Sequence, residues 1–151
     1  EGATMKITQE MHDDAVRQIA EMMFHFPGGE FTPGVFHPGW ATYTNVPEKK
    51  MAVPHYWMDD LYPDIVIVDT ERGNGPRVMA EVETEDSVSL EAAIQPKWKP
   101  DMDACSILYL FVPEGCARKT AKMLLDYKVC FPTALYTYGF NDDGTIRVTP
   151  V

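Results

Sequence analysis

Two apolar runs, Asp64-Ile-Val-Ile-Val-Asp69 and Arg77-Val-Met-Ala-Glu-Val-Glu-Thr84, flank a short polar segment near the middle of this chain. Both runs are rich in β-branched residues, which favour strands. The segment between them, Glu71-Arg-Gly-Asn-Gly-Pro76, contains the Gly, Asn and Pro residues that are typical of turns. The sequence therefore predicts a β-hairpin whose loop is longer than the tightest two-residue kind.

The segments on either side of this hairpin alternate between helical and extended patterns. Residues 9–24 carry apolar side chains at three- and four-residue steps, which predicts an amphipathic helix capped by Thr8. Residues 88–95 predict a helix that is capped by Ser87 and ends or kinks before Pro96. We also expect a buried strand at 105–112, a helix at 115–128, and two strands at 134–140 and 145–149 joined by a tight turn. This order predicts one α/β domain over residues 1–151, with a mixed β-sheet flanked by helices.

The segment 26–63 is expected to be irregular. Its six prolines and four glycines argue against long regular elements. It is also rich in aromatic residues, including Trp40, Tyr43, Tyr56 and Trp57. These rings could stack on bases or sugars, or they could cover an edge of the sheet, and the sequence does not choose between the two.

Composition limits the class of protein. The chain has 151 residues, of which 45% are apolar and 24% charged, values that exclude a disordered chain, a collagen-like repeat and a coiled coil. No apolar run is long enough to predict a membrane span, and the first residues do not resemble a secretory signal. Cys105, Cys116 and Cys130 lack zinc-site spacing, so we expect reduced thiols in a cytoplasmic protein.

The net charge of −10 argues against a protein that coats nucleic acid non-specifically, because such proteins are basic. Much of the acid excess lies before residue 65, and Glu81, Glu83, Glu85 and Asp86 form a local acidic cluster in the remainder. The net charge therefore argues against tight non-specific DNA binding. It does not argue against a metal-dependent site that contacts a phosphate group locally.

Three carboxylates of the hairpin are expected to lie close together. Glu81 and Glu83 share one face of the second strand because side chains alternate along a strand, and hairpin pairing brings Asp64 beside them. Carboxylates held together repel one another, so either some stay protonated or a cation lies between them. Oxygen ligands suit Mg²⁺ or Mn²⁺. The competing interpretation is a solvated strand end with no function.

The order Tyr62-Pro63-Asp64, then Glu81-Val82-Glu83, then a helix with Gln95, resembles the PD-(D/E)xK phosphodiesterase superfamily, which has the restriction-endonuclease-like fold. The resemblance implies that Asp64 and Glu81 bind Mg²⁺ or Mn²⁺ and that Val82 contributes its backbone carbonyl. The third motif position normally carries the lysine that orients or activates the attacking water. Here it is Glu83, as in the Glu-containing variants of the motif.

The resemblance also singles out Lys97 and Gln95. Some members of the superfamily supply the missing lysine from the helix after the motif, a role that Lys97 could fill although Pro96 disturbs the helix there. Gln95 is either a functional polar residue or one that satisfies backbone groups at a helix end. Further basic residues follow, and a phosphate backbone could be contacted there: Lys99, Arg118, Lys119 and Lys122.

The function implied by the resemblance is a metal-dependent phosphodiesterase, namely a DNA endonuclease in which Asp64, Glu81, Glu83, Gln95 and Lys97 are the catalytic candidates. An alternative is an inactive nuclease-like interaction module that binds a protein or another partner through its aromatic-rich segment. A third hypothesis is a regulatory partner of a nucleic-acid enzyme whose acidic surface mimics phosphate. A homodimer is also left open, because enzymes that cut both strands are often symmetric dimers.

Overall fold

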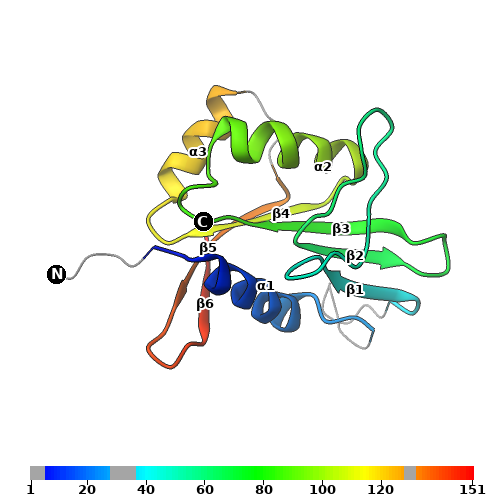
Figure 1. Cartoon of the computed structure of the whole chain (residues 1–151), viewed down its shortest axis with the longest axis horizontal. Coiled ribbons are helices and arrows are strands. Elements are labelled where there is room, and N and C mark those ends of the chain that lie inside the picture. The colour runs from blue at the N-terminus through cyan, green and yellow to red at the C-terminus, as the bar shows by residue number, and fades with distance from the viewer. Residues whose placement is uncertain (1–5, 28–36, 128–131) are drawn as a thin grey trace.

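Six strands form one sheet, in the order β1-β2-β3-β4-β5-β6, in the computed structural model, which describes residues 6–27, 37–127 and 132–151 (Figure 1). The first three strands pair antiparallel, β4 and β5 continue the sheet in parallel, and the last strand returns antiparallel. Their bounds are β1 Trp40–Thr44, β2 Ile65–Asp69, β3 Gly75–Val82, β4 Leu108–Pro113, β5 Ala134–Phe140 and β6 Ile146–Pro150. The predicted α/β class with a mixed sheet flanked by helices is confirmed.

Helices cover both faces of this sheet (Figure 1). The helix α1 (Gln9–Met23) packs on one face, where its apolar side contacts Ile65 and Ile67 of β2. The π-helix η1 (Leu90–Trp98), its continuation α2 (Lys99–Ala104) and α3 (Ala117–Asp126) cover the other face, which contains Val66 and Val68. Since both faces are covered, every residue of β2 is buried.

One strand was missed in the segment 26–63. β1 pairs with β2 from Trp40 opposite Asp69 to Thr44 opposite Ile65, and all its residues are half-buried. Five residues at the sheet edge lack a clear apolar alternation, so the strand depends on its pairing with β2 rather than on its own pattern. Elsewhere in 37–63 the chain is irregular as expected, apart from one bridge between Val53 and Leu61.

Of the two alternatives for the helix at 88–95, an end or a kink before Pro96, the end is wrong. The chain stays helical through Pro96 and continues to Ala104. It does so in π-helical form, in which the Lys99 N–H donates to the Ile94 carbonyl five residues back. In an α-helix the proline ring would clash with the carbonyl four residues back, and the wider π-turn relieves this conflict. Ser89, rather than Ser87, caps this helix by accepting from the Ala92 N–H at 3.0 Å.

The other predicted elements are confirmed with ends that move by up to three residues. Thr8 caps α1 as expected, because its side chain accepts from the Met11 N–H at 3.2 Å. The last predicted residue of the helix 115–128 lies outside the described residues, as does Cys130.

Candidate active site

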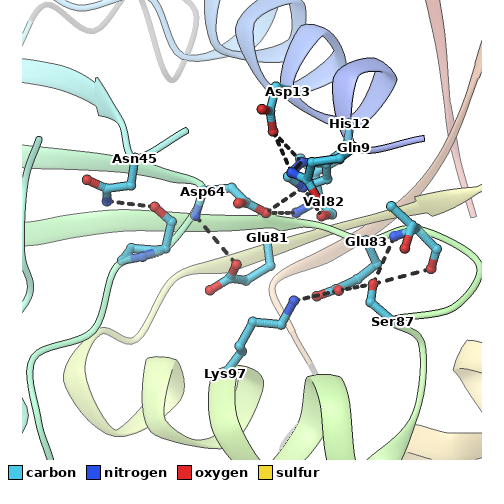
Figure 2. Close-up of polar contacts among 12 residues, drawn as sticks. Gln9, His12, Asp13, Asn45, Asp64, Glu81, Val82, Glu83, Ser87 and Lys97 are labelled. Carbon is cyan, nitrogen blue, oxygen red and sulfur yellow. Dashed lines mark hydrogen bonds and ion pairs between the residues drawn. The ribbon is translucent and has the colours of Figure 1, made fainter. Parts of the chain in front are cut away.

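Asp64 lies immediately before β2, opposite the end of β3. In this register Ile65 faces Ala80, so Asp64 falls beside Glu81, as predicted. Its Oδ2 accepts from the Val82 N–H at 2.8 Å, which replaces the strand pairing that ends at this point. The preceding turn is held by Asn45, whose Nδ2 donates to the Pro63 carbonyl at 2.7 Å (Figure 2). The hairpin thus fixes the Asp64 carboxylate at a strand end where it is almost fully buried.

Glu81 faces the layer formed by η1 and α2 and meets a carboxyl group there. The Glu81 side chain is 2% exposed, and Asp101 of α2 is 1% exposed. The two carboxyl groups lie close enough for each to affect the pKa of the other. Burial and the nearby charges of Asp101 and Asp64 raise the pKa of Glu81 well above its ordinary value. Burial also raises the pKa of Asp101, to about 6, against the opposing effects of the Glu81 hydrogen bond and the Lys97 charge.

Glu83 is completely buried, and three side chains donate to its carboxylate. Lys97 Nζ and Ser87 Oγ both donate to Oε1 at 2.6 Å (Figure 2). Trp98 Nε1 donates to Oε2 at 2.8 Å. Tyr138 Oη donates to the backbone carbonyl of the same residue at 2.5 Å. A buried carboxylate with this many donors is held in a single orientation as the anion.

The π-helical turn explains how consecutive residues reach the same carboxylate. Lys97 and Trp98 close η1, and Asp101 follows in the first turn of α2. Together they direct an ammonium and an indole N–H at Glu83, just after β3, and a carboxyl group at Glu81 of β3. Burial by itself lowers the pKa of Lys97, but the charges of Glu83 and Glu81 outweigh this effect and raise it. Lys97 therefore stays protonated, and its side chain is still 31% exposed.

On the opposite side, α1 contributes His12. Its Nε2 lies 2.8 Å from the Val82 carbonyl oxygen and 3.3 Å from Asp64 Oδ2, while Nδ1 lies 2.9 Å from Asp13 Oδ1 (Figure 2). Burial lowers the pKa of His12, but the hydrogen bond and charge of Asp64, with further bonds to Asp13 and Val82, raise it to about 9. His12 is thus a cation at neutral pH, with Asp64 as its buried counter-charge.

The structure brings most of the predicted site residues together. Asp64, Glu81, Glu83 and Lys97 form one cluster with Asp101, which we call the carboxylate cluster. Gln95 does not belong to it: its side chain is exposed and lines a surface cavity with Trp57 and Lys99. The π-turn directs Lys97 and Trp98 toward Glu83, whereas Gln95 lies at the surface, so a functional role for Gln95 stays a prediction.

The donor chemistry of the cluster fits a hard divalent cation. Apart from the Lys97 ammonium, the cluster offers carboxylate oxygens, and Asp101 Oδ2 is buried with no hydrogen-bond partner. As the side chains of the described residues lie, no three Asp, Glu, His or Cys groups are arranged to hold one ion. The Val82 carbonyl, expected as a ligand, accepts from His12 instead. An ion would therefore require side-chain rotation in the cluster.

Sequence reasoning missed His12, Asp101, Trp98 and Ser87 as members of this region. His12 was set aside because no histidine spacing matched a metal motif, and Ser87 was assigned to a helix cap. One signal was available in the sequence: Lys97 and Asp101 are four residues apart, and Trp98 is next to Lys97, in one segment that follows the acidic strand. The assumption that Pro96 ends the helix concealed it.

No family model matches this chain, and neither a curated protein nor a solved structure matches it. In the ranges that the structure describes, no helix is both long and apolar enough to cross a bilayer.

Proposed function

We propose that this chain is a Mg²⁺- or Mn²⁺-dependent phosphodiesterase that cleaves DNA, of the PD-(D/E)xK type, with its lysine supplied by the helix after the hairpin. The observation that carries the proposal is the 2.6 Å contact between Lys97 Nζ and Glu83, next to Asp64 and Glu81. The chain order of one helix, three antiparallel strands, a helical segment and a parallel strand supports the same assignment.

In this proposal each residue has a distinct role. Asp64 and Glu81 would hold the divalent ion, which supplies a Lewis acid and an activated water when it is bound. The Lys97 side chain is 31% exposed, whereas its partner Glu83 is fully buried. The Lys97 ammonium can therefore reach solvent, and it would donate to the attacking water or to a phosphate oxygen. Glu83 acts through Lys97 as a positioning residue, because its own oxygens are already occupied by Ser87, Lys97 and Trp98.

Basic side chains on the same face of the sheet support a phosphate-bearing substrate. Lys99 of α2 and Arg118 and Lys119 of α3 are exposed, and both helices cover the face to which Glu81 and Glu83 point (Figure 1). Lys122, a further candidate, is engaged by Asp126 at 2.5 Å. These positive charges lie on the helices that cover this face, so they counter part of the overall acidity there. We place the protein in the cytoplasm, in line with the free thiols of the two described cysteines, Cys105 and Cys116.

The test is a cleavage assay on single-stranded, linear duplex and supercoiled DNA with Mg²⁺ or Mn²⁺. We expect activity in the wild type, loss of activity in Asp64→Asn and Lys97→Met, and retained activity in Lys50→Met, whose side chain is exposed. Absence of cleavage with either metal on every substrate, or full activity of Asp64→Asn, would overturn the proposal.

The second candidate is a non-catalytic interaction module, and one observation favours it. Tyr56 is 80% exposed and Trp57 is 64% exposed, although large aromatic rings are usually covered. The adjacent His55 is buried and fixed to Asp103 at 3.0 Å, so the two rings are presented from an anchored loop. Under this hypothesis the double substitution Tyr56→Ala/Trp57→Ala abolishes partner binding in a cross-linking assay, while Asp64→Asn does not affect it.

A further inference from the structure

A small surface cavity lies where the segment between β1 and β2 meets the helical segment η1–α2. Its lining consists of Trp57, Gln95, Lys99, Pro100 and Asp103. The cavity has a volume of about 280 Å³, below the roughly 300–1,000 Å³ of pockets that enclose drug-sized ligands. It therefore suits one planar ring rather than a larger molecule.

The backbone that carries Trp57 is fixed beside α2, although the residue itself is 64% exposed (Figure 1). The His55 side chain is fully buried, and its Nε2 lies 3.0 Å from Asp103 Oδ2. The Trp57 N–H donates to His55 Nδ1 at 3.3 Å, and the two rings pack edge to face with their centroids 4.9 Å apart. An anchored ring that remains exposed is preorganised for stacking, because little conformational freedom is lost on binding.

Two polar side chains of the lining suit a nucleotide. Gln95 offers both an amide donor and an amide acceptor, the groups that hydrogen-bond to the edge of a nucleobase. Lys99 offers an ammonium group, and it forms no ion pair within residues 6–27, 37–127 and 132–151. Its charge is therefore available to a phosphate group.

Aromatic rings also bind cationic side chains, and acids around the ring favour that alternative. Asp103 is the acid of the cavity lining, and it is already engaged by His55. Asp59 and Asp60, which follow Trp57 closely in the sequence, line a different cavity. The unpaired charge at the Trp57 cavity is thus the Lys99 ammonium, which favours an anionic ligand over a cationic one.

We infer that this cavity binds one unpaired base of single-stranded DNA, with the base stacked on Trp57, its edge against Gln95 and its phosphate at Lys99. The inference rests on the proposed function and names single-stranded DNA as its substrate class. A strand bound here passes near the proposed site, because Lys97, which contacts Glu83, is two residues from Lys99. A base inside a duplex is paired and stacked, so it offers no free face to Trp57.

The experiment is fluorescence anisotropy with a labelled oligothymidine of about ten nucleotides, a length that single-strand-binding domains cover. EDTA is present to prevent cleavage, since no proposed metal ligand lines the cavity. We expect Trp57→Ala to weaken binding by about tenfold, because a base loses its stacking partner. Lys99→Met should reduce the slope of log affinity against log salt by about 0.7, the effect of one phosphate contact on a single strand. A duplex of the same length should bind at least about tenfold more weakly than the single strand.

Tyr56→Ala is the matched control, because Tyr56 is a neighbouring ring that is 80% exposed and does not line the cavity. It should bind the oligonucleotide like the wild type. The inference is overturned by any of these results: no binding by the wild type, equal affinity of Trp57→Ala and wild type, an equal loss in Tyr56→Ala, or equal affinity for the duplex. Binding of an arginine-rich peptide that depends on Trp57, without oligonucleotide binding, also overturns it and favours the interaction module.

DNA cleavage with Mg²⁺ or Mn²⁺ is scored separately from binding. Oligonucleotide binding that depends on Trp57, without cleavage of any substrate, overturns the proposed function alone. Cleavage by the wild type, with unaltered affinity of Trp57→Ala, overturns the inference alone.

Discussion

Lys97 Nζ lies 2.6 Å from Glu83 Oε1, and this contact joins the helical layer to the end of β3. Glu83 has no solvent exposure, so its charge depends on donors from the protein. Lys97 is the only one of its three side-chain donors that carries a positive charge. The pair therefore has a structural role as well as the proposed catalytic one, and the two roles can be separated by experiment.

Removing the lysine charge should destabilise the fold. We expect Lys97→Met to lower the free energy of unfolding by about 3 kcal/mol, because loss of one partner leaves a buried carboxylate uncompensated. Urea denaturation measures the change. The control Lys99→Met, at an exposed position, should change it by less than about 0.5 kcal/mol. Equal stability of the two variants would show that Glu83 does not need the ammonium.

The hydrogen bond from the Trp98 indole to Glu83 should stabilise the fold independently of the Lys97 ion pair. Trp98→Phe removes the N–H that donates to Glu83 Oε2 at 2.8 Å, and a hydrogen bond to a charged group contributes about 1.5–3 kcal/mol. A double-mutant cycle with Glu83→Gln separates this bond from the loss of ring volume. We expect a clear coupling energy between the two positions. Trp57→Phe, at an exposed position, serves as the control that should show none.

Stability should depend on pH through His12. Its pKa is raised from 6.5 to about 9 in the folded protein, so the protonated form is favoured by folding. This contribution is fully present below pH 6.5 and is lost as pH rises to about 9, with a slope of at most about 1.4 kcal/mol per pH unit. His12→Gln should flatten the stability curve between these values. The curve of His25→Gln, altered at an exposed histidine, should match that of the wild type.

The stability of the fold should depend on the Asn45 side chain, which holds the turn before Asp64. Its side chain is buried, donates to the Pro63 and Met51 carbonyls, and accepts from the Lys50 and Met51 N–H groups at 2.8 Å. Asn45→Ala leaves these backbone groups without partners, so we expect a loss of about 3 kcal/mol in unfolding free energy. Thermal unfolding checks the effect. The exposed Asn141→Ala variant is the comparison, and an equal loss there would contradict the role of Asn45.

The hairpin and its acids could be predicted because their signals are local. A strand alternates its side chains every second residue, so Glu81 and Glu83 had to share a face wherever the strand lay. The turn between 71 and 76 then determined that Asp64 would return beside Glu81. The α/β class followed from the order of such local patterns, and it is confirmed.

Other features depended on partners far away in the sequence. The strand β1 forms because β2 offers a free edge, which its own five residues do not reveal. The rule that proline ends a helix assumes α-helical geometry, and the π-turn around Pro96 departs from it. The contacts of His12 with Asp64 and Val82 span more than fifty residues and exist only once α1 packs on the sheet.

The amino-acid sequence alone determined the class of fold and the presence of carboxylates at the end of a buried hairpin, because both follow from short-range periodicity. The tertiary structure decided which groups surround each of those carboxylates. Lys97 and Trp98 donate to Glu83, and His12 pairs with Asp64. Burial and the carboxyl group of Asp101 raise the pKa of Glu81. These pairings depend on how two helical layers pack across a sheet, and burial is what turns each of them into a strong electrostatic interaction.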